Sequence, residues 1–289
     1  MLVVVLNLLT RKIHYLKQWL NLIKTSLEEG KEPVIGKLRN VKLVEADLQI
    51  GMRIALNSQK EELIETDNRF SKANYGSRRN YSITSALLQK RLTFDNSLIS
   101  MKCTVHALTD LQSCYDRQLP NIGSIVEESA GRNRREMQLC AKIMLYFQNH
   151  VSTGCGVSEK YYGGENKLAG TGQGNKFSGD MCRDISCLII RQLEVENLGI
   201  CFLSLVTLIT VLCASVSLVD DADLAADGEN SVSQMQMMLK LCNKLHSATG
   251  GKTQVEKTKF FAWTWTWSQG KKKIKNVDAN IQLNNQPMQ

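Results

Sequence analysis

Paired cysteines are missing from this sequence. It has nine cysteines, but no two are spaced as Cys-x-x-Cys and none has a histidine partner at finger-like distance, which argues against a structural zinc site. A secretory signal is also missing, because the short apolar start from Leu2 to Leu9 is followed, not preceded, by Arg11 and Lys12. An odd number of cysteines without such a signal indicates reduced thiols. We therefore expect an intracellular protein, in the nucleus or the cytoplasm, that is not secreted.

Internal repeats and low-complexity segments are absent too, and 289 residues suffice for one large or two modest domains. The 36 basic and 28 acidic residues give a net charge of +8 and an isoelectric point near 9.0. This balance favours a polyanionic partner, with a membrane surface as the competing interpretation. The basic clusters lie at Arg78-Arg79, Arg132 to Arg135 and Lys271 to Lys273. Each of them also fits a solvated surface.

The stretch from Leu198 to Val219 carries no charge and is long enough to span a bilayer. A membrane span is therefore one alternative. Against it, the stretch is rich in Val, Thr, Ser and Ile, and it ends directly in Asp220 and Asp221. Strands buried on both faces give the same apolar pattern. We expect two strands and a turn here, and no stable membrane association.

Adjacent carboxylates at the end of a buried strand are costly unless a cation neutralises them. Asp220 and Asp221 have this position, and Asp110 follows a second short strand expected from Cys103 to Leu108. Carboxylate oxygens suit Mg²⁺, and two such ions are typical of in-line phosphoryl transfer. The simpler alternatives are a polar turn for the Asp pair and a helix N-cap for Asp110.

Glycines are dense between Gly170 and Gly179. They would let the backbone approach a ligand or a template base closely, although an ordinary flexible loop has the same composition.

In chain order these segments resemble the palm of a reverse transcriptase. The resemblance rests on four motifs: Asp110-x-x-x-x-Tyr115, Gln173-Gly174-x-x-x-Ser178, Leu218-Val219-Asp220-Asp221, and a glycine turn at Gly250-Gly251 that leads to Lys257. The phrases around Tyr115 and Gln173 are similar to those of eukaryotic non-LTR retrotransposon polymerases. Gly179 departs from the family's Pro, and Leu218 from its Tyr or Phe.

The resemblance implies an α+β fold with right-hand polymerase fingers and palm, and an antiparallel palm sheet of split βαβ type with helices on one face. It divides the chain into a leading helix (1–30), a fingers-like segment (31–105), a palm (106–262), and a post-palm strand with a loose tail (263–289). The sequence ends soon after Lys257, so the thumb would be largely missing. We therefore expect a fragment or a decayed copy of a mobile-element polymerase.

The function implied by the resemblance is RNA-directed DNA polymerisation, with an RNA template, a DNA primer and dNTPs as partners. Asp110, Asp220 and Asp221 would ligate two Mg²⁺ ions, with Mn²⁺ as a substitute, and Lys257 would be a general acid. The other implied contacts are the sugar at Tyr115, the template and incoming base at Gln173 and Gly174, the triphosphate at Arg39 and Lys42, and nucleic acid at Arg78, Arg79 and Ser178. The alternative from another class is an inactive nucleic-acid-binding remnant.

Patterns of spacing predict further elements. Apolar residues at helical spacing predict a helix over residues 10–30, and Ser82 is a plausible N-cap for a helix over 82–99. A further helix is expected over about 122–150. Trp263, Trp265 and Trp267 alternate with Thr, so they should share one face of a strand, either to stack bases or to cap a hydrophobic edge.

Overall fold

The computed structural model describes residues 11–12, 14–28, 38–55, 70–76, 78, 80–153, 155–163, 170–203, 206–218, 221–284 and 286–288. The chain divides into two compact units, each made of two segments. Unit 1 comprises Met1–Arg69 and Ser113–Asp184, and unit 2 comprises Phe70–Gln112 and Ile185–Gln289. The expected names and boundaries of fingers and palm stay a prediction.

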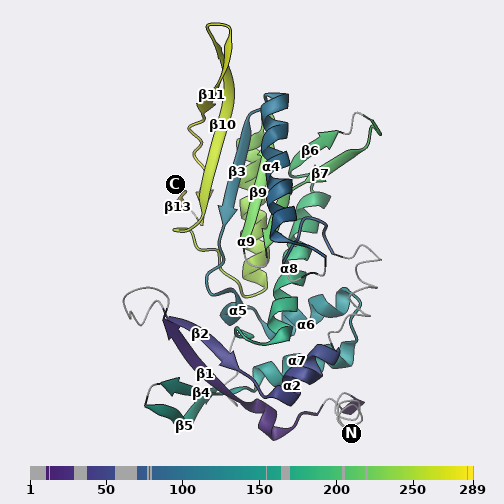
Figure 1. Ribbon diagram of the computed structural model, residues 1–289, viewed down its shortest axis with the longest axis vertical. Coiled ribbons are helices and arrows are strands. Elements are labelled where there is room, and N and C mark those ends of the chain that lie inside the picture. Colours follow the sequence, from purple (N-terminus) through teal and green to yellow (C-terminus); the bar gives the residue numbers. More distant parts are fainter. Residues whose placement is uncertain are drawn as a thin grey trace. The chain divides into compact units, whose positions relative to one another are not determined.

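Unit 1 contains a four-stranded sheet in the order β2-β1-β4-β5 (Figure 1). Its strands are β1 (Asn21–Glu28), β2 (Leu38–Leu43), β4 (Gln148–Thr153) and β5 (Gly156–Gly163). β1 pairs antiparallel with β2 and parallel with β4, and β4 pairs antiparallel with β5.

The helices of unit 1 bury its largest apolar side chains. They are η1 (Lys17–Leu20), α2 (Ala46–Ala55), α5 (Cys114–Arg117), α6 (Pro120–Ser129), α7 (Arg134–Leu145) and the part of α8 (Lys176–Val195) that ends at Asp184. Trp19 is 1% exposed, and its indole nitrogen donates to Asp47 at 2.9 Å, which joins η1 to α2. A buried Trp needs such a partner for its N–H group.

Unit 2 contains a five-stranded antiparallel sheet in the order β11-β10-β3-β9-β8. Its strands are β3 (Thr104–Thr109), β8 (Ser215–Leu218), β9 (Asp221–Asp227), β10 (Lys259–Ser268) and β11 (Lys271–Asn276). Two smaller antiparallel pairs are β6 (Ile200–Leu203) with β7 (Thr210–Cys213), and β12 (Gln282–Leu283) with β13 (Gln286–Pro287). The expected α+β class, with antiparallel sheets, is confirmed.

Two long helices, α4 (Ile83–Ser100) and α9 (Ser231–Ala248), run along this sheet (Figure 1). The N-cap predicted for α4 is confirmed, because the Ser82 hydroxyl accepts from the Ser85 amide at 3.1 Å. Lys90 of α4 forms an ion pair with Asp223 of β9, so α4 lies over the face that carries Asp223. Side chains alternate along a strand, and the opposite face holds buried residues such as Val105 and Ala107. α9 contacts β3 and β9 and covers that face, so helices lie on both faces of the sheet, and the expectation of helices on one face is wrong.

Two expected helices are corrected by the structure. The leading helix over 10–30 is wrong for residues 17–28, which form η1 and then β1. The apolar spacing there fits a helix, but pairing with both β2 and β4 satisfies the backbone as a strand. The helix over 122–150 is two helices and a strand, because Gly131 turns the chain at a φ of 101° and Asn133 caps a new helix, α7.

The loose tail is also wrong. Ile281 and Leu283 are 1% and 2% exposed, and β12 contacts α9. The side chain of Gln236 bonds the backbone of Gln282 twice, accepting at 2.8 Å and donating at 2.7 Å. Burial of these apolar side chains holds a segment that looks merely polar in the sequence.

The described part of the uncharged stretch contains three strands, β6, β7 and β8, where two were expected. Among the described residues, no helix is long and apolar enough to cross a bilayer.

Candidate functional site

The predicted carboxylates lie at one end of the sheet in unit 2. Asp221 is the first residue of β9 and pairs with Leu218 across the β8–β9 hairpin. Thr109, the last residue of β3, pairs with Ala222, so Asp110 follows β3 at the end where β9 begins. The expectation that Asp110 and Asp221 come from neighbouring antiparallel strands is confirmed. Asp220 lies outside the described residues.

Lys257 is brought to this site by backbone pairing between two segments that are far apart in the sequence. Leu111 forms an antiparallel bridge with Thr253, and the Gln254 amide donates to the Asp110 carbonyl at 2.9 Å. The turn that follows contains Lys257, whose Nζ lies 3.2 Å from Oδ2 of Asp110. The two residues that the fourth and first motifs predicted as functional are therefore in contact.

The electrostatics of this end of the sheet favour a cation. Oδ2 of Asp110 is buried and makes no hydrogen bond, and the close Lys257 ammonium contacts it as an ion pair. Partial desolvation, and after it the charge of Asp110, raise the pKa of Asp221, while Lys257 lowers it. Asp110 and Asp221 thus concentrate negative charge at this end of the sheet, and the exposed ammonium group of Lys257 offsets only part of it.

A cavity of about 330 Å³ opens at this end of the sheet and is lined by Asp110, Asp221, Asp223 and Lys257. Carboxylate oxygens are the donors that Mg²⁺ prefers, so Asp110 and Asp221 fit such an ion. Among the described residues, no three His, Cys, Asp or Glu side chains are grouped to hold a metal. The third carboxylate of the prediction, Asp220, is outside that part of the chain.

The glycine-rich segment of unit 1 is tied to two of the predicted motifs. The carbonyl of Tyr115 accepts from the amides of Thr171 and Gly172 at 2.7 and 2.9 Å. Gln173 bridges in parallel to Val41 of β2, and its carbonyl accepts from the Lys42 amide at 2.8 Å. The structure therefore brings together four residues predicted to bind substrate, namely Tyr115, Gln173, Gly174 and Lys42.

This close approach requires glycine. Gly172 and Gly174 have φ values of 74° and 115°. A Cβ on Gly172 would lie 2.1 Å from Cδ of Lys42, and a Cβ on Gly174 would lie 2.5 Å from the Lys42 carbonyl oxygen. The glycine-rich segment is thus a packed connection against β2, and the flexible-loop alternative does not describe it.

Lys42 is an unusual cation because its residue is only 7% exposed. Burial lowers the pKa of Lys42, Asp116 opposes this effect, and Lys24 adds to it. Arg39, the other predicted triphosphate contact, lies in β2 and pairs with Leu27 of β1.

The residues predicted to contact nucleic acid have other neighbours in the structure. Arg78 is 8% exposed, donates to the Asn74 carbonyl at 2.7 Å, and lies 3.7 Å from the ring centroid of Tyr81. Ser178 is 1% exposed, and its hydroxyl donates to the Asn175 side chain at 2.8 Å in the first turn of α8. Arg79 lies outside the described residues.

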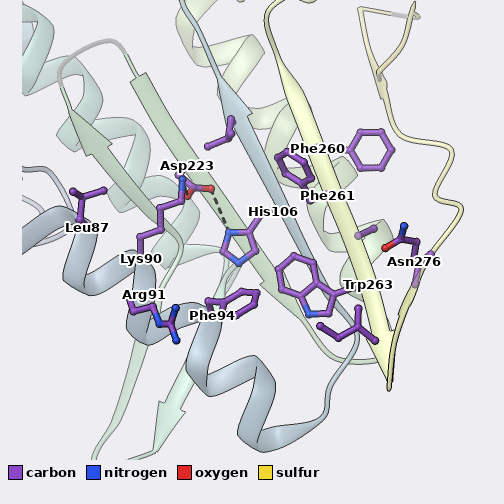
Figure 2. A pocket seen from close by; sticks show the side chains of 14 residues that line it. Leu87, Lys90, Arg91, Phe94, His106, Asp223, Phe260, Phe261, Trp263 and Asn276 are labelled. Atoms are coloured by element: carbon purple, nitrogen blue, oxygen red, sulfur yellow. Dashed lines mark hydrogen bonds and ion pairs between the residues drawn. The ribbon is translucent and has the colours of Figure 1, made fainter. Parts of the chain in front are cut away.

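One polar group on the same face of the unit 2 sheet was missed by the sequence analysis. Oδ2 of Asp223 forms an ion pair with Nζ of Lys90 at 2.7 Å, and its other oxygen lies 3.3 Å from Nδ1 of His106 (Figure 2). Side chains alternate between the two faces of a strand, so the sequence of β3 could have placed His106 on the same face as Leu108, the residue that pairs with Asp223. Nothing in the sequence links Lys90 to Asp223.

Comparisons with known proteins find similarity in structure only. No family model matches the chain, and no curated protein matches it. The fold is similar to telomerase from Candida tropicalis in complex with a TWJ fragment of telomeric RNA, with a TM-score of 0.57 and 15% identity over 86% of this chain and 42% of that one. It is also similar to apo telomerase from Candida tropicalis truncated from its C-terminal domain, with a TM-score of 0.57 and 15% identity over 94% of this chain and 59% of that one. The chain thus spans less than two thirds of either telomerase chain, and at this identity the likeness shows the fold alone.

Proposed function

We propose that this chain is a template-directed nucleotidyltransferase of the reverse transcriptase type, which adds dNTPs to a primer 3′-hydroxyl on an RNA template. The observation that carries the proposal is the arrangement of Asp110 and Asp221 on neighbouring strands, with Lys257 on Asp110. The telomerase-like fold supports the same class of activity, and one of those telomerase structures contains RNA.

The carboxylates are the proposed ligands of Mg²⁺, with Asp220 as the third. When bound, the metal would lower the pKa of the attacking hydroxyl and neutralise charge on the phosphates. The primer 3′-oxygen would form a bond to the α-phosphorus of the dNTP, and the bond to pyrophosphate would break. Lys257, already next to Asp110, is the proposed donor of a proton to that leaving group.

Unit 1 is proposed to hold the nucleotide and the template. Tyr115 would contact the sugar and exclude a 2′-hydroxyl, and its carbonyl bonds to Thr171 and Gly172 support a fixed position. Gln173 and Gly174 would contact the template and the incoming base, and Lys42 and Arg39 the triphosphate. A buried, partly desolvated lysine such as Lys42 would gain more from a phosphate than an exposed one would.

The contacts with nucleic acid are proposed from the positive net charge of the chain. The net charge of +8 favours a polyanion. Arg78, Arg79 and Ser178 keep their predicted role as contacts of the template, with Arg78 ordering the segment that precedes it through its bond to Asn74.

Primer extension tests this function. The assay uses an oligo-dT primer on poly-rA with Mg²⁺, and compares the natural chain with Asp110→Asn and Asp221→Asn. Each substitution should reduce incorporation by about 100-fold or more, since a bound metal supplies several kcal/mol to the transition state. Asp227→Asn is the matched control, because Asp227 ends the same strand β9 but pairs with Lys102 at 3.1 Å, outside the carboxylate cavity.

Loss of incorporation in both site variants, with activity kept in Asp227→Asn, supports the proposal. No incorporation by the natural chain, with primer-template still bound, contradicts it and favours the alternative of an inactive nucleic-acid-binding remnant.

A further inference from the structure

A second cavity, of about 720 Å³, lies in unit 2 beside the carboxylate cavity. Figure 2 shows it between α4 and the strands β3 and β10, with Asp223 at one side and Trp263 at the other. Neither Asp110 nor Asp221 lines it, so the role proposed for those carboxylates does not account for it.

Aromatic rings form the floor of this cavity. The rings of His106 and Trp263 are stacked, with centroids 5.3 Å apart and planes within 8° of parallel. Phe94 lies against Trp263 at 5.5 Å, and the Trp263 indole nitrogen donates to Ser97 at 3.2 Å, which fixes the ring. A rigid flat surface of this kind suits a flat ligand ring.

Two polar atoms of the described residues that line the cavity make no hydrogen bond, Oδ2 of Asp223, which is in an ion pair, and Nε2 of His106. Nδ1 of His106 lies 3.3 Å from Asp223, whose other oxygen is held by Lys90 at 2.7 Å. A carboxylate only accepts, so a hydrogen is on Nδ1. Nε2 is buried without a partner, and the His106 side chain is 9% exposed. A buried polar atom without a partner calls for a hydrogen-bonding group on a ligand.

The rim of the cavity combines exposed apolar groups with positive charge. Leu87, Phe261 and Ile274 are 59%, 54% and 52% exposed, although they are large apolar side chains. Lys90 and Arg91 stand on α4 at the same rim, with side chains 43% and 67% exposed. β11, which supplies Ile274, carries lysines at four of its six positions. A ligand that covers the apolar rim and also carries negative charge fits both features.

We propose that this cavity binds a planar heteroaromatic ring with a polar ring atom and an attached phosphate, the chemistry of a nucleotide. The ring packs against Phe261 and the edge of the stacked Trp263 and His106 rings, its polar atom bonds Nε2 of His106, and the phosphate meets Lys90 or Arg91. This binding goes beyond the proposed polymerase activity, because it needs neither the carboxylate pair nor a metal. The nucleotide is either free or one base of a single strand.

Direct titration tests the proposal on the full chain in EDTA, without dNTPs. The probes are adenosine 5′-monophosphate, a short oligo-dA, and an abasic oligonucleotide of equal length and charge. Base stacking on aromatic side chains predicts that oligo-dA binds about tenfold more tightly than the abasic strand. Trp263→Leu and Phe261→Ala should each remove most of this difference. Phe261 is more than half exposed, so its replacement leaves the core intact if Trp263→Leu does not fold.

Trp267→Leu is the matched control. Trp267 lies on the same face of β10, is 68% exposed, and does not line the cavity. The proposal holds if this variant keeps the preference for oligo-dA and both cavity variants lose it. Binding of the monophosphate identifies a free nucleotide as a ligand, and binding of oligo-dA alone identifies a base within a strand.

Equal affinity for oligo-dA and the abasic strand together with no binding of the monophosphate would overturn the proposal. A preference that survives in Phe261→Ala and Trp263→Leu would do the same. Either failure leaves the primer-extension result unaffected, because these titrations contain no metal and measure no catalysis.

Discussion

Gly174→Ala is the sharpest probe of the connection between the glycine-rich segment and β2. Gly174 has a φ of 115°, and a Cβ there would lie 2.5 Å from the Lys42 carbonyl oxygen and 3.4 Å from Cγ1 of Val41. The oxygen is backbone, so β2 or the glycine-rich segment must move by several tenths of an ångström. That shift would stretch the 2.8 Å bond from the Lys42 amide to the Gln173 carbonyl.

The cost has two parts, and the chain offers a control that separates them. Backbone strain at positive φ costs about 1–3 kcal/mol for a residue other than glycine. Gly156 has nearly the same φ, 122°, but a Cβ there would meet nothing within 4 Å, so Gly156→Ala pays the strain alone. Loss of the Lys42 hydrogen bond adds about 1 kcal/mol, and the residual overlap adds to it. We expect Gly174→Ala to exceed Gly156→Ala by about 1–2 kcal/mol.

Hydrogen exchange read by mass spectrometry measures this difference locally. In Gly174→Ala, the peptide containing Lys42 should exchange about 5- to 30-fold faster than in Gly156→Ala, which corresponds to 1–2 kcal/mol. Equal acceleration in the two variants would refute the reasoning, because it would mean that only the φ strain matters and that the approach to β2 is not tight.

Two further predictions concern buried ionisable groups. Arg132→Met should destabilise unit 1 by about 3–5 kcal/mol, because the fully buried Arg132 pairs with fully buried Glu127 and lies 4.0 Å from Asp184. Urea denaturation should show the loss, and adding Glu127→Met should restore much of it. A double variant that is no more stable than Arg132→Met alone would contradict this. Burial lowers the pKa of His246 from 6.5 to about 4, so the fold keeps the ring neutral, and stability present above pH 6.5 should fall as the pH drops toward 4. The fall is at most about 3 kcal/mol because the ring is partly exposed. If the urea midpoint of His246→Leu depends on pH as steeply as that of the natural chain, His246 is not the cause of the fall.

Local pattern predicted the carboxylate end of the unit 2 sheet well. An apolar, β-branched run that ends in two acidic residues indicates a strand followed by a turn, and the structure has β8 paired antiparallel with β9 there. The pairing of β3 with β9 follows from the order of the motifs, which the resemblance supplied. Lys257 was also predicted, but its contact with Asp110 depends on the bridge from Leu111 to Thr253, which leaves no mark in either local sequence.

The failures have a common physical cause. Residues 21–28 have apolar positions that suit a helix, yet they form β1 because two partner strands are available on either side. The C-terminal residues look polar, yet two buried apolar side chains and a glutamine on α9 hold them. In both segments the deciding interactions come from residues distant in sequence, and propensity is too weak to compete with them.

The aromatic cavity also depends on contacts between residues distant in sequence, which local patterns do not predict. Each of its components was visible in the sequence: the alternating Trp residues of β10, a histidine two residues before Leu108, and basic residues in the helix over 83–100. What the sequence did not show is that Lys90 holds Asp223, which in turn holds Nδ1 of His106. This chain of contacts occupies Nδ1 of a buried histidine that lines the cavity and leaves its Nε2 without a hydrogen bond. His106→Phe keeps a ring against Trp263 and removes Nε2, so in the titration with oligo-dA it should lose affinity while Tm stays close to that of the natural chain. An unchanged affinity would show that the ligand ring binds without a hydrogen bond to this residue.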